Sequence, residues 1–250
     1  MKKKQSAGEK IIVALDTPDL KRAKRLVKLL RHLIPNFKIG SELYTMHGPD
    51  AVKAVRWAGG HVFLDLKYHD IPNTVAGAVR AATLMNVFMI SIHAAGGREM
   101  MEAARRAMEE GARKRRVRRR PKLVAVTVLT SMSEEILHSE VGIGASLNET
   151  VTRFARMAEL TGMDGVVASA RELPVRRSAF GRDLLVVTPG IRPAWSVQGD
   201  QTRIVTPEKA LALGADYLVI GRPITQAKDP REAAERLIRE VKMTSVYEAA

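Results

Sequence analysis

Residues 61–85, HVFLDLKYHDIPNTVAGAVRAATLM, contain one complete strand-to-helix unit. The run His61–Leu66 is short and mainly apolar, which is typical of a buried strand, and Asn73–Met85 has the length and spacing of a helix. A charged segment that includes a proline separates the two. A strand followed at once by a helix predicts a parallel sheet, because each helix then crosses back to the start of the next strand.

The same alternation extends over most of the chain. Expected strands cover residues 11–15, 37–39, 61–66, 87–92, 123–128, 165–168, 184–188 and 217–220. Expected helices cover residues 18–33, 49–57, 73–85, 98–110, 148–161, 207–213 and 230–241. About eight such units favour a closed α/β fold, the (β/α)8 TIM barrel, over an open doubly wound sheet. The turn Leu15-Asp-Thr-Pro18 also lacks the glycine-rich fingerprint of dinucleotide-binding sheets.

The length of 250 residues fits a single barrel. We expect one domain over residues 1–250, with residues 1–10 as a flexible tail and residues 112–121 as a basic connection between a helix and a strand. Hydrophobic residues make up 46% of the chain and aromatic residues only 4%, so the core is expected to be aliphatic. No apolar run approaches the roughly 20 residues of a membrane helix, so no membrane partner is expected.

The chain contains no cysteine. Disulfides, thiolate zinc sites and cysteine nucleophiles are therefore excluded, and a reducing compartment is indicated, so we expect a cytoplasmic protein. The six histidines show no metal-ligand spacing such as His-x-x-x-His, and no metal site is expected.

The net charge of +14 favours anionic partners such as phosphorylated metabolites or nucleic acid. Much of this excess lies in residues 113–120, RKRRVRRR, where seven of eight side chains are basic. We interpret this run as a solvated connection on the barrel face opposite the active site. Nucleic-acid binding is the alternative, but no aromatic side chains for base stacking interrupt the arginines, so we do not expect a nucleic-acid partner.

Polar residues follow the expected strands at the points where each strand ends. Barrel enzymes carry their chemistry at the carboxyl ends of the strands, so these residues are expected to form one site. They are Asp16, Lys38, Asp65, Lys67, His93, Thr130, Ser131, Ser169, Arg192 and Arg222.

The densest group is Asp65-x-Lys67-x-x-Asp70, at the end of the third expected strand. Residues two apart in a strand share a face, so Asp65 and Lys67 are predicted to point together into the barrel mouth. Burial alone would favour a neutral lysine, whereas flanking carboxylates keep it charged and able to donate a proton. An exposed ion-pair cluster is the alternative, but the strand end and the apolar residues before it favour a functional site.

A phosphate site is predicted where Thr188-Pro-Gly190-Ile-Arg192 follows the seventh strand and Gly221-Arg222 follows the eighth. Barrels frequently bind phosphate with these two loops. Glycine allows backbone N–H groups to approach the phosphate oxygens, and an arginine can bind two oxygens at once. The intervening segment Gln198-Gly-Asp-Gln201 is a candidate lid.

Taken in order, these motifs resemble the orotidine 5′-monophosphate decarboxylases, from about residue 11 to residue 226. The matching segments are Ala14-Leu-Asp16, Lys38-Ile-Gly40, Asp65-x-Lys67-x-x-Asp70-Ile71-x-x-Thr74, Pro189-Gly-Ile-Arg192, Gly199-Asp-Gln201 and Ile220-Gly-Arg222. The resemblance implies a cofactor-free decarboxylase that converts orotidine 5′-monophosphate to uridine 5′-monophosphate in pyrimidine biosynthesis. It also implies a homodimer of barrels.

The resemblance also implies roles for individual residues. Lys38, Asp65 and Lys67 of one chain would form a charged row with Asp70 of the neighbour, and Lys67 would donate the proton to C6 of the pyrimidine. Ile71 and Thr74 would come from the same neighbour. The remaining substrate contacts would be Asp16 on the ribose, Ser131 on the pyrimidine, and Gln198, Gly221 and Arg222 on the phosphate, with Pro189, Arg192 and Gln201 beside them.

Two alternatives remain. Sugar-phosphate lyases and synthases of the same barrel group share the Asp-x-Lys-x-x-Asp element but require Mg²⁺ and an extra carboxylate near the second strand, for which Glu42 is available. Lys38-Ile-Gly40 and Pro189-Gly-Ile-Arg192 argue against this assignment. The second alternative is a nucleic-acid-binding protein that uses the arginine run, with steeply salt-dependent binding.

Overall fold

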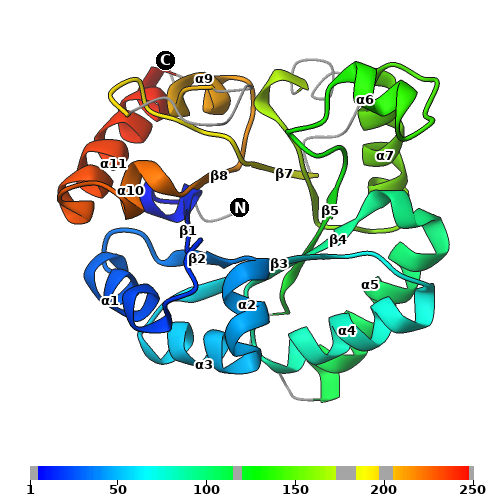
Figure 1. Cartoon of the computed structure of the whole chain (residues 1–250), viewed down its shortest axis with the longest axis horizontal. Helices are drawn as coiled ribbons and strands as arrows, with labels where there is room; N and C mark the ends of the chain where they lie inside the picture. Colours follow the sequence, from blue (N-terminus) through cyan, green and yellow to red (C-terminus); the bar gives the residue numbers. More distant parts are fainter. Residues whose placement is uncertain (1–4, 115–119, 173–183, 197–204, 248–250) are drawn as a thin grey trace.

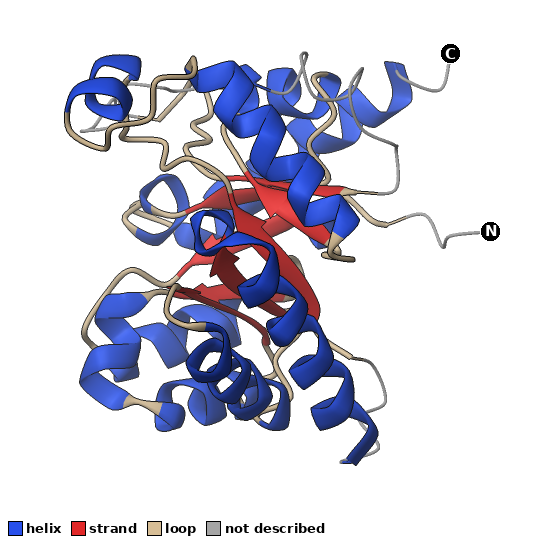
Figure 2. Ribbon diagram, turned by 90° about the vertical axis from the view of Figure 1, so that its right-hand side faces the viewer, coloured by secondary structure: helices blue, strands red, loops and turns tan. Residues whose placement is uncertain are grey.

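The eight strands form a closed parallel barrel in which each strand pairs with the next in the chain and β8 pairs with β1. The computed structural model describes residues 5–114, 120–172, 184–196 and 205–247. The strands are β1 (Ile11–Ala14), β2 (Asn36–Ile39), β3 (His61–Tyr68), β4 (Met89–His93), β5 (Lys122–Val126), β6 (Gly165–Val167), β7 (Leu185–Thr188) and β8 (Tyr217–Ile220). Figures 1 and 2 show them at the centre of the molecule, surrounded by helices. The predicted (β/α)8 fold is confirmed.

Helices cover the outside of the barrel (Figure 1). They are α1 (Leu20–Leu30), α2 (Ser41–His47), α3 (Pro49–Trp57), α4 (Pro72–Leu84), α5 (Gly97–Lys114), α6 (Glu134–Ser139), α7 (Leu147–Leu160), α9 (Pro207–Ala212), α10 (Arg222–Thr225) and α11 (Pro230–Tyr247), with 3₁₀ turns at Gly8–Lys10, Ala94–Gly96 and Ala170–Glu172. The sequence did not predict α2, α6 and α10. These helices span seven residues or fewer, too short for a clear helical period.

Alternate strand residues pack into two separate apolar layers. Ile12, Phe63 and Val187 point inward and belong to a cluster that fills the barrel, whereas Val13 and Leu64 belong to the layer between strands and helices. A fully buried aliphatic side chain contributes about 1.5–3 kcal/mol. Burial on both faces explains why the strand sequences are apolar throughout rather than alternating.

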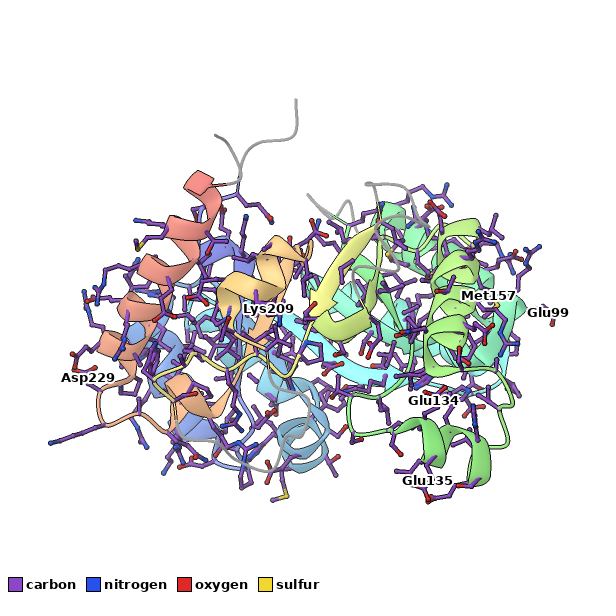
Figure 3. The ribbon with its side chains drawn as sticks, turned by 90° about the horizontal axis from the view of Figure 1, so that it is seen from above. Glu99, Glu134, Glu135, Met157, Lys209 and Asp229 are labelled. Atoms are coloured by element: carbon purple, nitrogen blue, oxygen red, sulfur yellow. The ribbon has the colours of Figure 1, made fainter. Side chains whose placement is uncertain are left out.

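Charged side chains lie on the outer surface of the helical ring. Glu99 and Asp229 project from opposite edges of the molecule (Figure 3), and both residues are exposed. No helix in the described ranges is long and apolar enough to cross a bilayer.

The expected flexible tail is wrong for residues 5–10, which pack against the amino-terminal end of the barrel. Gln5 Nε2 donates to the Tyr217 hydroxyl at 2.7 Å, and Asn36 Nδ2 donates to the Glu9 carbonyl at 2.8 Å. Ala7 is buried, and a Cβ at Gly8 would collide with the Leu33 carbonyl. The segment is polar in sequence, but it satisfies the polar groups at the start of the strands, which a composition argument does not reveal.

The expected basic connection over residues 112–121 is also partly wrong. Helix α5 continues to Lys114, so residues 112–114 are helical. Arg120 is held at the start of β5, where its two Nη atoms each donate to an Asp164 oxygen at 2.7 Å. Residues 115–119 lie outside the described residues. The last arginine of the run therefore has a structural partner.

Asp164 joins the starts of β5 and β6. Its Oδ2 atom also accepts the Leu123 N–H at 2.8 Å and lies 3.4 Å from Arg105 Nη1. Burial tends to raise the pKa of Asp164, but the hydrogen bonds from Arg120 and Leu123 and the nearby arginine charges outweigh it and hold the pKa below its usual value. Ionised Asp164 therefore stabilises the fold.

Replacement of Asp164 by Asn is expected to lower the free energy of unfolding at neutral pH by about 1–3 kcal/mol, because hydrogen bonds to a charged group are lost while Arg120 remains. Chemical denaturation of both proteins measures the difference. The difference should shrink in acid, as pH falls through the folded-state pKa of Asp164 and the wild-type carboxylate takes up a proton.

The exposed pair Arg231–Glu235 provides the control, with Nε 3.1 Å from Oε1. Its Glu235→Gln variant should change stability by less than about 1 kcal/mol. Equal losses in the two variants would contradict a special role for Asp164.

Candidate active site

Two cavities open at opposite ends of the barrel. The larger, of about 850 Å³, is lined by the first residues of several strands, including Asn36, His61, Lys122 and Tyr217. The smaller, of about 510 Å³, lies at the carboxyl ends of the strands. Barrel enzymes carry their chemistry at that end, so the smaller cavity is the candidate active site despite its size. Its lining includes Ala14, Asp16, Lys38, Phe63, Asp65, Lys67, Val126, Thr130, Val167, Pro189, Gly190, Arg192, Gly221, Arg222 and Gln226.

Four charged side chains of alternating sign form a row along this cavity. Lys38 Nζ lies 2.9 Å from Asp16 Oδ1 and 3.7 Å from Asp65 Oδ2. Lys67 Nζ donates to the same Asp65 Oδ2 at 2.9 Å. The side chains of Lys38 and Asp65 in the middle of the row are 12% and 10% exposed, whereas Asp16 and Lys67 at its ends are 61% and 37% exposed.

Glycine at position 40 leaves room for this row. A Cβ at Gly40 would lie 3.0 Å from Lys38 Nζ and 3.5 Å from Asp16 Oδ1. Any larger residue would displace one partner of the Lys38–Asp16 pair. This explains the motif Lys38-Ile-Gly40 at the junction of β2 and α2 in steric terms.

Asp65 and Lys67 both line the cavity, as predicted. Regular strand alternation does not fully explain why their side chains point the same way. Lys67 has φ +51°, a left-handed conformation that is uncommon for a residue with a side chain. The pairing of β3 with β4 shifts at this point, with Leu64 opposite Ile90 but Tyr68 opposite Ile92. Three residues of β3 therefore face one residue of β4, and this bulge sets the direction of Lys67.

The two predicted arginines line the same cavity. Pro189, Gly190 and Arg192 after β7 and Gly221 and Arg222 after β8 all line it. Gly190 has φ +75°, which favours glycine. The backbone at Gly221 passes close to β1, since a Cβ there would lie 3.4 Å from the Ala14 side chain. The two predicted phosphate loops therefore line the same cavity as the charged row.

Hydrogen bonds hold Arg192 and Trp195 in the segment after β7. Arg192 N–H donates to the Val205 carbonyl at 3.0 Å. Trp195 Nε1 donates to Glu240 Oε1 of α11 at 2.6 Å, and the Arg236 guanidinium lies 4.8 Å from the centre of the indole ring. The predicted substrate contacts Gln198 and Gln201 lie outside the described residues.

Asp70, Ile71 and Thr74 lie outside the cavity of their own chain. All three are exposed, and Ile71 is 67% exposed, which is high for a large apolar side chain. Asp70 Oδ1 accepts the N–H of Ile71 at 2.6 Å, at the start of α4. The described residues thus do not bring Asp70 to Lys67 within one chain.

The structure does not bring Ser131 into the cavity either. Ser131 is exposed, whereas the preceding Thr130 is half-buried and lines the cavity. Strand β5 ends at Val126, and the following turn decides which hydroxyl faces inward. Both residues are polar and follow the same expected strand, and the sequence has no signal that distinguishes them.

Ser91 is the buried contact that sequence reasoning missed. Its Oγ donates to Asp65 Oδ1 at 2.8 Å and accepts the Lys67 N–H at 3.0 Å. Ser91 is fully buried in the middle of β4. A single serine within an apolar strand is a weak sequence signal, because its role depends on the partner strand.

Two histidines stack beside the row. The rings of His69 and His93 lie 5.1 Å apart at 18°. Burial lowers the pKa of His93, and the charges of His69 and Lys67 lower it further. His93 is therefore neutral near pH 7 and adds no positive charge beside Lys67.

Among the described residues, no group of three His, Asp or Glu side chains is placed to hold a metal ion. Glu42, the carboxylate available to the Mg²⁺-dependent alternative, is exposed on α2 and does not line the cavity. The charged row is built from Asp and Lys in direct contact, an arrangement suited to fixed charge and proton transfer.

Comparison with known proteins agrees with these features. The sequence model of the Orotidine 5′-phosphate decarboxylase / HUMPS family matches residues 9–237. Relatives named orotidine 5′-phosphate decarboxylase include one from Moorella thermoacetica, 52% identical over 237 residues (95% of this chain, 94% of the relative). Another, from Syntrophomonas wolfei, is 50% identical over 236 residues (94% and 98%).

Solved structures give the same result. The crystal structure of orotidine 5′-phosphate decarboxylase from Lactobacillus acidophilus superimposes with a TM-score of 0.81 and 37% sequence identity, covering 93% of this chain and 99% of that chain. The resemblance identified from the motifs is confirmed along nearly the whole length. The chain belongs to the Orotidine 5′-phosphate decarboxylase / HUMPS family.

Proposed function

We propose that this chain converts orotidine 5′-monophosphate to uridine 5′-monophosphate and CO₂ in pyrimidine biosynthesis. Family membership and relatives at about 50% identity support this activity. The observation that carries the assignment within the site is the row Asp16–Lys38–Asp65–Lys67, with two arginines lining the same cavity. A cytoplasmic location is part of the proposal, in keeping with a metabolic enzyme.

The cavity dimensions and lining suit a nucleotide. Its volume of about 510 Å³ lies in the range of small-molecule sites. The phosphate would bind between Arg192, Arg222 and the backbone at Gly221, where charge and close backbone approach favour an anion. Asp16 and Lys38 would hold the ribose hydroxyls, which places the pyrimidine over Lys67.

At the pyrimidine, Thr130 replaces Ser131 in the proposal, because Thr130 lines the cavity and Ser131 does not. Phe63, Val126 and Val167 provide an apolar wall beside it. An apolar wall excludes water and strengthens the charge interactions of the lysines.

The chemistry requires a cation beside C6. When the bond between C6 and the carboxylate breaks, CO₂ leaves and the electron pair remains on C6 in the plane of the ring. The Lys67 ammonium would stabilise this charge as it forms and then transfer a proton from Nζ to C6. Asp65, 2.9 Å from Lys67 Nζ, would hold this ammonium group in position.

One preorganised donor contributes roughly 3–4 kcal/mol to a transition state. Lys67 alone therefore accounts for part of the rate enhancement. Binding of the distant phosphate must supply the rest through positioning of the substrate.

A homodimer completes the proposal. Asp70, Ile71 and Thr74 are exposed on the loop after β3 and the start of α4, outside the cavity of their own chain. In a two-fold dimer these residues could enter the partner's cavity, with Asp70 extending the charged row. The exposed Ile71 side chain would then be buried.

Turnover of orotidine 5′-monophosphate in excess EDTA tests the reaction. The ultraviolet absorbance of the orotate group should fall without added metal, and Lys67→Ala should lower kcat by at least about 100-fold, because a transition-state donor is removed. Lys53→Ala is the matched control, since Lys53 pairs only with exposed Asp50 on α3. A folded wild-type protein without activity, or activity restored only by Mg²⁺, would refute the assignment.

The shared site predicts complementation between two inactive variants. Lys67→Ala and Asp70→Ala homodimers should each be impaired, because each lacks a charge in both sites. After the variants are mixed and subunits exchange, each heterodimer has one intact site and one doubly altered site, so activity should return to about one quarter of wild type. Asp70→Ala with wild-type activity, or no recovery despite exchange, would argue against a shared site.

The histidine pair predicts acid sensitivity. The pKa of His93 is lower in the folded state than in the unfolded chain, so the unfolded chain binds the proton more readily. Its contribution to stability is present above the unfolded value of about 6.5 and is lost as pH falls. Between pH 7 and pH 5, His93→Asn should therefore lose less thermal stability than wild type. Exposed His32→Asn should follow wild type, and identical curves for all three proteins would contradict the prediction.

A further inference from the structure

We propose that Ser91 is a positioning residue that holds both Asp65 and Lys67 in their working geometry, an inference that rests on the proposed function. The hydroxyl of Ser91 contacts one residue through its side chain and the other through its backbone. Oγ donates to Asp65 Oδ1 at 2.8 Å and accepts the N–H of Lys67 at 3.0 Å.

The bulge in β3 explains why the Lys67 N–H needs the Ser91 hydroxyl as its acceptor. Leu64 pairs with Ile90 and Tyr68 pairs with Ile92, so residues 65–67 face Ser91 alone. A regular parallel ladder would give the Lys67 N–H a backbone carbonyl of β4 as its acceptor. The Ser91 side chain provides the acceptor instead, which satisfies a backbone donor that would otherwise be costly to bury.

The same contact stabilises an unfavourable backbone conformation. Lys67 has φ +51°, and non-glycine residues in this region persist where the surroundings hold them. If the Ser91 acceptor were lost, Lys67 would be free to relax towards extended backbone. Its side chain would then turn away from the line of the charged row.

Ser91 also gives the two oxygens of the Asp65 carboxylate different partners. Oδ1 accepts from Ser91, and Oδ2 faces both lysines, at 2.9 Å from Lys67 Nζ and 3.7 Å from Lys38 Nζ. A carboxylate fixed at one oxygen cannot rotate to give both oxygens to one lysine. Ser91 thereby keeps Oδ2 shared between the two ammonium groups.

Burial makes the arrangement rigid. Ser91 is fully buried, and Met89 and Phe63 of the inner apolar layer lie on the same two strands. No water is required for either hydrogen bond, since both are direct. Ser91 does not line the cavity, so its effect on the reaction would pass through Asp65 and Lys67 rather than through the substrate.

The test compares Ser91→Ala with Ser91→Thr, which keeps the hydroxyl. Ser91→Ala should lower kcat by about 10- to 100-fold, the scale of a small misplacement of a reacting group, with KM within about 3-fold of wild type. Ser91→Thr should recover most of kcat. Titration with uridine 5′-monophosphate measures the fraction of protein that still binds nucleotide. A lower kcat per binding site can then be distinguished from a smaller amount of folded protein. Thr83→Val, which deletes a buried hydroxyl bonded only to Val79 of its own helix, should match wild type.

Amide hydrogen exchange measured by NMR gives a readout that does not depend on the reaction. The Lys67 amide should exchange at least about 10-fold faster in Ser91→Ala, because its acceptor is gone, and stay protected in Ser91→Thr. The Phe88 amide, bonded to the Val62 carbonyl at 2.8 Å, should be unchanged.

These measurements separate the two proposals. A wild-type protein that does not decarboxylate orotidine 5′-monophosphate refutes the proposed function, while the exchange of the Lys67 amide still decides whether Ser91 holds it. Unchanged kcat and unchanged Lys67 exchange in Ser91→Ala would overturn the role of Ser91. Equal loss of kcat in Ser91→Thr and Ser91→Ala would do the same, since the hydroxyl would then not be the determinant.

Discussion

Closure of eight parallel strands into a barrel is the constraint on which the rest of the structure depends. Every strand is buried on two faces, by the inner apolar layer and by the helices. Because all strands run the same way, their carboxyl ends meet at one rim. Asp16, Lys38, Asp65 and the two arginines are far apart in sequence and come together only for this reason.

Within that rim, one carboxylate organises the site. Two ammonium groups would repel each other in an apolar cavity, and Asp65 Oδ2 between them offsets this repulsion. In the proposed reaction this arrangement would place fixed positive charge beside the reacting carbon, with little reorganisation as the charge develops. The apolar barrel interior below the row lowers the local dielectric constant, which strengthens the attraction between these charges.

The bulge in β3 shows how a strained backbone is supported at a functional site. Lys67 adopts a left-handed conformation, and the displaced N–H finds its acceptor on the adjacent strand. Strain of this kind costs on the order of 1–3 kcal/mol and is retained where neighbouring contacts hold it. At the other end of the barrel, Asp164 with Arg120 and Gln5 with Tyr217 satisfy polar groups at the starts of the strands and leave the carboxyl rim for function.

The amino-acid sequence was sufficient to predict the barrel, its family and the charged residues that line the cavity. Alternating apolar and amphipathic segments indicate directly which residues are buried. The charged residues of the cavity follow strands that can be recognised in the sequence, and they are Asp16, Lys38, Asp65, Lys67, Arg192 and Arg222. Tertiary structure alone decided which hydroxyl after β5 faces inward, that residues 5–10 pack on the barrel, and that Ser91 supports the charged row. Each of these depends on contacts between distant segments or on the course of a turn. Hydrophobic periodicity carries no information about such contacts, because a hydrogen bond across a bulge depends on the register of two strands rather than on either strand alone.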